Sequence, residues 1–282
     1  MPLDQESTRL ILRKLSRQLG KLASKPAPEN IHRFRTSSRR AEVLVADLAE
    51  ERSRNDKKLM RLLGRLRKKA GRVRDLDVEI AALRSLKIPQ EPMRKSQLMR
   101  TLAEERGERE KKLVKSLDKK TVSEARKRLK RTAASLEISK NINPVTVALH
   151  KVTALELDHN VITEDTLHRF RIAGKRARYI AEMAGKNPEA IRLAEQLKHM
   201  QDAIGDWHDW AQLAQRAEKL FGGVQNSALV AALRNVARAK FRQAVNTLTE
   251  TRPKLVSSSA AAVTPIGRRP SRQSSLPHAA VA

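Results

Sequence analysis

The sequence predicts an all-α protein, on two observations. Glycine accounts for only 10 of the 282 residues, and the helix-favouring residues Leu, Ala, Lys, Arg and Glu are abundant. Apolar residues recur every three or four positions along almost the whole chain, as in helices with one buried face, and strand-like alternation is nearly absent. A coiled-coil rod is the alternative, but frequent breaks and the lack of sustained heptads disfavour it. The 40% hydrophobic content suffices for one or two domains.

Six helices are predicted before about residue 140, separated by residues that break helices. Pro26 and Pro28 divide the first helix from the second. Gly71 divides the third from the fourth, and Pro89 and Pro92 lie between the fourth and the fifth. The expected ranges are 5–23, 29–52, 53–70, 74–87, 96–117 and 121–136.

Five more helices are predicted in the second half. Pro144 opens this half, and Gly185 with Pro188, then Gly205, then the Gly222-Gly223 pair mark its breaks. The expected ranges are 144–157, 164–185, 188–204, 206–221 and 225–250. Residues 253–282 are rich in Ser, Ala and Pro and lack a periodic apolar face, so the sequence predicts a disordered basic tail there. Such a tail is either a solubilising extension or an electrostatic tether.

The charge of the chain predicts a polyanionic partner. There are 59 Lys and Arg against 31 Asp and Glu, a net charge of +28. Residues 1–150 hold 39 basic and 19 acidic residues (+20), whereas residues 151–250 hold 15 and 12 (+3). Nucleic acid, an anionic membrane and a phosphate polymer all fit a basic surface. Only 7 aromatic residues are present, too few for the stacking platforms of most single-strand binders.

Several functional classes find no support in the sequence. Without cysteine there is no disulfide framework, thiolate zinc site or cysteine nucleophile, which is compatible with a reducing cytoplasm. The N-terminal sequence lacks a signal-peptide core, and no apolar run is long enough to span a membrane. No phosphate-binding glycine loop, nucleophile elbow or zinc-protease motif occurs. We therefore expect no enzyme activity, no cofactor and no metal.

Two short motifs occur twice, in the same order. Residues 31–40 read IHRFRTSSRR and residues 167–176 read LHRFRIAGKR, which share an His-Arg-Phe-Arg core and a basic end at an offset of 136. A Gly-x-x-x-Asp motif follows each copy, at Gly71 to Asp75 and at Gly205 to Asp209. Recurrence in order and at nearly one spacing indicates a duplication, with repeats at about 5–140 and 144–250.

The first motif places a basic row and an apolar row on different sides of each helix. At 100° per residue, His32, Arg35 and Arg39 align on one side, while Phe34 belongs to the apolar side. Cations at this spacing repel one another and, near a helix N-terminus, oppose the helix dipole, so a bound polyanion would relieve both effects. A solvated basic face is the alternative for one copy. The candidate binding residues are His32, Arg35, Arg39, Arg40, His168, Arg171, Lys175 and Arg176.

These duplicated motifs resemble the CHAD domain, the conserved histidine α-helical domain. The resemblance covers roughly residues 5–250 and implies two four-helix bundles related by pseudo-twofold symmetry around a basic groove or pore. It also implies that the ligand is inorganic polyphosphate and that the protein associates with polyphosphate granules. The eight candidate residues match the family motifs by position. Two departures are Gly174 inside the second motif helix, and Trp207 and His208 in the second Gly-x-x-x-Asp motif.

Other polar and aromatic residues carry weaker hypotheses. Further basic residues could extend the site, with a plain surface role as the alternative: Arg65, Lys68, Arg74, Arg178, Lys198, Arg234 and Arg238. Four aspartates are expected to cap helices or to pair with motif arginines rather than bind metal: Asp75, Asp77, Asp206 and Asp209. Trp207 and Trp210 are expected to pack in the core.

The function expected from the residues and the resemblance together is non-catalytic binding of polyphosphate, in the cytoplasm and at granules. Arginine forks and lysine ammonium groups suit a chain that carries charge on every phosphate and has no bases. Non-specific nucleic-acid binding is the first alternative, and metal-dependent processing of polyphosphate is the second. The sequence points to no particular protein partner.

Overall fold

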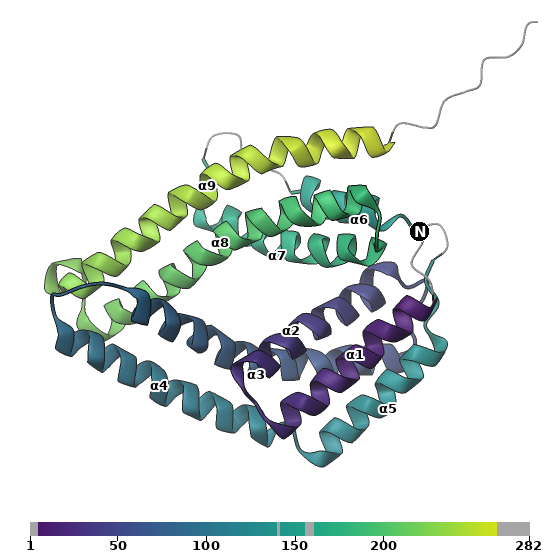
Figure 1. The fold of residues 1–282 in the computed structure, drawn as a ribbon, viewed down its shortest axis with the longest axis horizontal. Helices are drawn as coiled ribbons and strands as arrows, with labels where there is room; N and C mark the ends of the chain where they lie inside the picture. The colour runs from purple at the N-terminus through teal and green to yellow at the C-terminus, as the bar shows by residue number, and fades with distance from the viewer. Residues whose placement is uncertain (1–4, 140–141, 156–160, 264–282) are drawn as a thin grey trace, which may run out of the picture.

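The computed structural model describes residues 5–139, 142–155 and 161–263, and these residues are mostly helical (Figure 1). The prediction of an all-α fold is confirmed for this part of the chain. An isolated antiparallel bridge between Ala49 and Ile138 is the extended pairing seen there. The elements are α1 (Gln5–Ser24), α2 (Pro28–Val43), the π-helical turn η1 (Leu44–Leu48), α3 (Arg54–Ser85), α4 (Pro92–Lys115), α5 (Lys119–Ser135), α6 (Pro144–Thr153), α7 (Glu164–Ala181), the 3₁₀ turn η2 (Glu182–Ala184), α8 (Pro188–Phe221), the 3₁₀ turn η3 (Val224–Asn226) and α9 (Ala228–Val263).

Local sequence signals explain where many of these helices begin. Proline occupies the first turn of α2, α4, α6 and α8, where its missing N–H costs no intrahelical hydrogen bond. Ser53 caps α3 in a capping box, because its hydroxyl accepts from the Asp56 N–H while the Asp56 carboxylate accepts from the Ser53 N–H. Asn187 caps α8 by accepting from Glu189 and Ala190 N–H.

Two predicted breaks are wrong, because Gly71 lies inside α3 and Gly205 lies inside α8. These helices run for 32 and 34 residues, and neither glycine adopts a positive φ. A glycine inside a helix costs only about 1 kcal/mol relative to alanine, which packing along a long helix easily offsets. Gly185 and Gly222 do end helical segments, with φ of 66° and 82°.

The predicted tail is also partly wrong, because α9 continues through Pro253 to Val263. Leu255 is 1% exposed and belongs to the larger hydrophobic cluster together with Leu248, which lies about two helical turns earlier. This burial offsets the hydrogen bond that Pro253 removes from the helix. The rest of the predicted tail, residues 264–282, lies outside the described residues.

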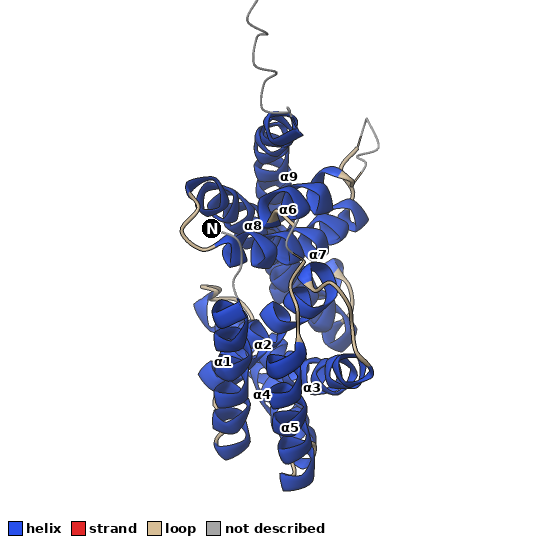
Figure 2. Ribbon diagram, turned by 90° about the vertical axis from the view of Figure 1, so that its right-hand side faces the viewer, coloured by secondary structure: helices blue, strands red, loops and turns tan. Residues whose placement is uncertain are grey.

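The helices form two groups, α1–α5 and α6–α9, which lie one above the other in Figures 1 and 2. In the first group α1 packs on α2 and α5, and α3 packs on α2, α4 and α5. In the second group α7 packs on α6 and α8, and α9 packs on α6 and α8. The two groups meet where α2 contacts α7 and where α3 contacts α8.

Two hydrophobic clusters join the groups. The larger includes side chains of both groups, among them Phe34 and Phe170. The smaller is built by the C-terminal parts of α3 and α8 with α4 and the start of α9, and includes Leu76 and Leu213. The changeover between clusters falls after Val73 in α3 and after Trp207 in α8. The polar residues of the Gly-x-x-x-Asp motifs therefore lie between two apolar regions.

Candidate functional site

The two motif helices bury the apolar side that the sequence predicts. Phe34 in α2 and Phe170 in α7 are at most 1% exposed, and both belong to the larger hydrophobic cluster. His32 and His168, at the N-terminal ends of the basic rows, are exposed. Arg35, Arg39, Arg171 and Lys175 are half-buried. Because α2 contacts α7, the apolar anchoring of both helices brings the two basic rows toward one another.

Four cations from the two rows form the central cluster, defined as Arg35, Arg39, Arg171 and Lys175. The pKa of Arg35 is lowered, mainly by burial and also by repulsion from Arg39 and Arg171, while Asp75 opposes this shift. Burial also lowers the pKa of Arg171, whose positive neighbour is Arg39. Each motif helix therefore contributes two cations that repel those of the other.

Two carboxylates from the Gly-x-x-x-Asp motifs face this cluster. Asp75 in α3 lies 3.7 Å from the Arg35 guanidinium. Burial raises the pKa of Asp209 in α8, and the nearby Arg171 and Lys175 oppose that shift. Two carboxylates cannot neutralise four cations, and Arg74 of α3 adds positive charge beside Arg35. The cluster keeps a net positive charge in a place that is only partly open to water.

Lys175 is the most strongly perturbed cation of the cluster. Burial lowers its pKa to about 7, and repulsion by Arg171 and Arg39 acts in the same direction, whereas Asp209 opposes it. A lysine with such a pKa exchanges its proton near neutral pH and gains a full charge when an anion approaches.

Three histidines border the cluster, and the sequence singled out only two of them as binding residues. His32 is exposed, yet partial desolvation of its ring lowers its pKa, and the positive charges of Arg74, Arg35 and Arg178 act in the same direction. His208 of α8 lies beside His168, with 5.9 Å between ring centroids. Burial and the positive charge of Arg171 together lower the pKa of His208 to about 4. His208 is neutral at pH 7 and can donate one hydrogen bond.

The position one helical turn before Asp75 is a glycine, Gly71, because the Arg35 guanidinium lies against it. A Cβ atom at Gly71 would lie 2.3 Å from Nη1 of Arg35, so any side chain there would displace the guanidinium. The glycine lets Arg35 lie against α3, where Asp75 reaches it. The second copy differs, because a Cβ at Gly205 would meet nothing within 4 Å.

In the second copy the close contact is at Gly174, and it involves side chains of α8 and no motif arginine. A Cβ there would lie 2.6 Å from the Met200 Cε atom, and the Gln201 side chain donates a 2.6 Å hydrogen bond to the Gly174 carbonyl. The unusual glycine inside the motif helix thus allows α7 and α8 to pack closely.

A family model described as the CHAD domain matches residues 7–218 of the chain. The chain belongs to the CHAD-domain family. The resemblance inferred from the motifs is therefore confirmed, although the match ends inside α8 and does not include α9.

Two solved structures share this CHAD fold. The CHAD domain from the plant Ricinus communis is 18% identical, with a TM-score of 0.60 over 89% of this chain and 88% of that one. PptA from Streptomyces chartreusis is 12% identical, with a TM-score of 0.61 over 89% of this chain and 96% of that one. No curated protein matches the chain.

Two of the eight candidate residues in this CHAD domain are engaged by carboxylates of the opposite helix group. Arg40 donates to Glu182 through Nε and Nη2, at 3.0 and 2.6 Å. Arg176 donates to Asp47 through the same two atoms, at 2.6 and 2.7 Å. Lys151 also lies 3.4 Å from Asp47. The Arg176–Asp47 pair is bidentate, whereas both donors of Arg40 reach the same Glu182 oxygen. The two pairs join α2 and η1 to α7 and η2, and Glu182 also faces Arg178 at 3.5 Å.

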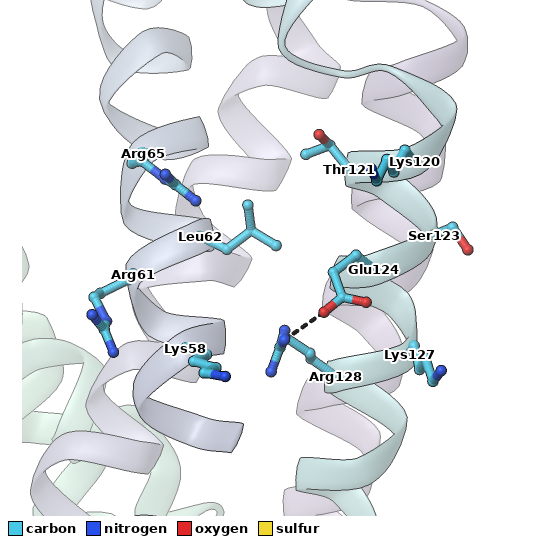
Figure 3. A pocket seen from close by; sticks show the side chains of 10 residues that line it. All are labelled: Lys58, Arg61, Leu62, Arg65, Lys120, Thr121, Ser123, Glu124, Lys127 and Arg128. Atoms are coloured by element: carbon cyan, nitrogen blue, oxygen red, sulfur yellow. Dashed lines mark ion pairs between the residues drawn. The ribbon is translucent and has the colours of Figure 1, made fainter. Parts of the chain in front are cut away.

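The seven weaker candidates have varied places in the CHAD domain. Arg74 and Arg178 act on His32 and so lie near the central cluster. Lys198 pairs with Asp202, and Arg234 pairs with Glu218. Arg65 lines a cavity between α3 and α5, away from the motif helices (Figure 3). Lys68 and Arg238 are exposed.

The four aspartates singled out by the sequence all lie inside helices α3 and α8. Asp75 and Asp206 lie inside helices, so the capping hypothesis is wrong, and Asp75 instead pairs with motif residue Arg35. Asp77 pairs with Arg106 and Asp206 with Lys240. The packing of the tryptophans is confirmed, since Trp207 is 5% exposed and Trp210 packs against the smaller cluster.

Over the described residues there is no group of three possible metal ligands, and no helix is long and apolar enough to cross a membrane.

Proposed function

We propose that the protein binds inorganic polyphosphate through the central cluster, without catalysing a reaction, and that it associates with polyphosphate granules. The observation that carries this proposal is the convergence of four half-buried cations from α2 and α7 with only two facing carboxylates. Family membership supports the choice of ligand, because CHAD domains are associated with polyphosphate.

The chemistry of the cluster fits a phosphate chain. Each arginine offers a fork of donors to phosphate oxygens, and Lys175 offers a point charge that strengthens when an anion arrives. The exposed histidines at the ends of both rows, His32 and His168, add hydrogen-bond donors. None of these contacts reads a base, and a chain of phosphates needs none.

A pseudo-twofold arrangement of two repeats is part of this proposal. The reciprocal ion pairs support it, because Arg40 of the first motif reaches the end of the second motif helix while Arg176 reaches the end of the first. Under such symmetry the two basic rows would line one groove and hold a linear anion along its length.

Nucleic acid is the alternative ligand, favoured by the net charge of +28. A competition experiment separates the two. Long-chain polyphosphate bound to the full chain should resist displacement by duplex DNA at equal phosphate concentration. Displacement at that concentration would favour the nucleic-acid function instead.

The decisive variant is Arg35→Ala combined with Arg171→Ala. Polyphosphate affinity, measured by calorimetric titration at fixed salt, should fall by at least about 100-fold, because each charge-assisted bond contributes about 1.5–3 kcal/mol. The matched control is Arg33→Ala with Arg169→Ala, which removes the same charge from exposed positions of the same helices. Equal losses in both double variants would show that net charge, and not the cluster, binds the chain.

A further inference from the structure

Helix α3 carries a second basic face that does not belong to the central cluster. At 100° per residue, five cations of α3 fall within about 80° of one another, over about 21 Å of helix. We call them the outer stripe: Lys58, Arg61, Arg65, Lys69 and Arg72. Arg74, which acts on the central cluster, lies about 180° from Arg65 on the helix. The two basic surfaces are therefore on different sides of α3.

A large cavity opens beside the N-terminal part of the outer stripe. It has a volume of about 990 Å³ and lies between α3 and α5. Figure 3 shows Arg65 and Leu62 of α3 pointing toward α5, and Arg128 of α5 pointing back toward α3. Lys120 and Lys127 of α5 complete its basic lining. Glu124 is the acidic residue among those that line it, and it pairs with Arg128 at 2.5 Å.

A second cavity lies at the other end of the stripe. It has a volume of about 420 Å³. Its lining residues are all cations, contributed by α3 and by the C-terminal part of α4. They are Lys69, Arg72, Arg109, Lys112 and Lys115. The outer stripe thus runs from one basic cavity to another along a single helix face.

The charges of the outer stripe are not neutralised by the protein. In the described parts of the chain, none of its five residues forms an ion pair, whereas Arg67 of the same helix pairs with Glu42 at 2.7 Å. Lys120 and Lys127, which line the larger cavity, form no ion pair in the described parts of the chain either. Like charges at three- and four-residue spacing destabilise a helix by a few tenths of a kcal/mol per pair, and a bound anion would remove that cost.

The shape of the stripe indicates a linear ligand with closely spaced charges. The lining of both cavities contains no aromatic side chain on which a base could stack. Thr121 and Ser123 also line the larger cavity, and the Thr121 hydroxyl donates to Asp118. A groove between neighbouring helices admits a single extended chain far more readily than a nucleic-acid duplex.

We propose that the outer stripe is a second polyphosphate-binding site, so that one molecule holds two separate stretches of chain. The choice of ligand rests on the proposed function, whereas the site itself does not. Arg65 and Arg74 are nine residues apart, or about 14 Å along the helix axis, and on opposite faces. Inorganic tripolyphosphate is too short to span that separation and can report on each site alone.

The test compares three variants of the full chain by calorimetric titration with tripolyphosphate at low salt. The stripe variant carries Lys58→Ala, Arg65→Ala and Arg72→Ala, all at exposed positions. The control variant carries Arg100→Ala, Arg192→Ala and Lys219→Ala, which remove the same charge from exposed positions that form no ion pair within the described residues. The central variant carries Arg35→Ala and Arg171→Ala.

We expect the stripe variant to bind fewer tripolyphosphate molecules per chain than the wild type, and the control variant to bind as many. Long-chain polyphosphate should be cross-linked by the wild type, with a rise in light scattering, and not by the stripe variant. The inference is overturned if the stripe and control variants are indistinguishable in both measurements.

The two proposals can fail separately. If the central variant keeps full stoichiometry while the stripe variant loses part of it, the proposed function fails and the second site stands. If the stripe variant loses affinity for duplex DNA but keeps the tripolyphosphate stoichiometry of the wild type, the stripe is a nucleic-acid surface, and the inference is wrong.

Discussion

Lys175 is the cation of the central cluster whose charge changes near neutral pH. Its pKa is lowered to about 7 by burial and by Arg171 and Arg39, so it is partly neutral in the free protein at neutral pH. A protonated histidine would add positive charge and a second hydrogen-bond donor for a polyanion. Desolvation lowers the pKa of His32 and, to about 4, that of His208, which moves the histidine contribution to more acidic pH.

Polyphosphate affinity should therefore rise as the pH falls from about 9 to about 7, by at most about tenfold per pH unit, because a bound polyanion raises the pKa of Lys175. The stability of the free protein should change in the opposite direction over the same range. The unfolded chain keeps the lysine proton up to the ordinary pKa of 10.5 while the folded chain has released it, so stability rises with pH.

Calorimetric titrations across this pH range, together with urea denaturation, check both slopes. Lys175→Arg is the matched variant, since arginine keeps its charge throughout. An affinity of the wild type that is as flat as that of Lys175→Arg would contradict the assignment.

At the scale of single residues, the sequence predicted which cations lie on the two basic rows, because a helix with a strong apolar side fixes the position of the other side. It could not predict which carboxylate each cation meets. Arg40 and Arg35 lie on the same helix, yet Glu182 engages Arg40 from 142 positions away, whereas Arg35 faces Asp75 at 3.7 Å. Pairing over such a distance leaves no local pattern in the sequence.

At the scale of elements, periodicity predicted most helices, and the errors came from over-reading single glycines and prolines. Gly71 and Gly205 lie in helix interiors because both sides of each glycine pack into hydrophobic clusters. Gly71 has a steric role toward Arg35 that no local rule could reveal. The sequence predicts a tail from Pro253, yet Leu255 is buried two residues later.

The burial of Leu255 yields a stability prediction for the end of α9. Leu255→Ala should lower the free energy of unfolding by about 2–5 kcal/mol, as expected for a buried leucine. Val256→Ala is the control, because Val256 is 46% exposed and should tolerate the change. Urea denaturation measures both. Similar small effects in the two variants would mean that this part of α9 contributes nothing to the core.

At the scale of the whole molecule, reciprocal ion pairs link the two groups of helices. Arg40 and Glu182 are about one-third exposed, so their pair should contribute no more than about 1 kcal/mol. Arg40→Ala should therefore lower stability slightly and change polyphosphate affinity far less than Arg35→Ala does. A double-mutant cycle with Glu182→Ala isolates the pair. A loss of affinity as large as that of Arg35→Ala would make Arg40 a ligand-binding residue.

For the overall arrangement, the sequence indicates two related helical units but not which of their surfaces meet. Duplicated motifs indicated two related helical units before any helix was located in space, and family membership is now established over residues 7–218. Which surfaces of the two units meet depends on contacts between distant segments, and local patterns do not encode them.

The position of the central cluster between two hydrophobic clusters has a thermodynamic consequence. Apolar contacts fasten the helix groups on both sides of the cluster, so neither group is free to swing toward a ligand. The side chains of the cluster lose conformational entropy when the protein folds. The burial of apolar surface supplies the free energy that brings these cations together. A captured chain of phosphates then loses its own freedom and little of the protein's, which is the advantage of a preorganised receptor.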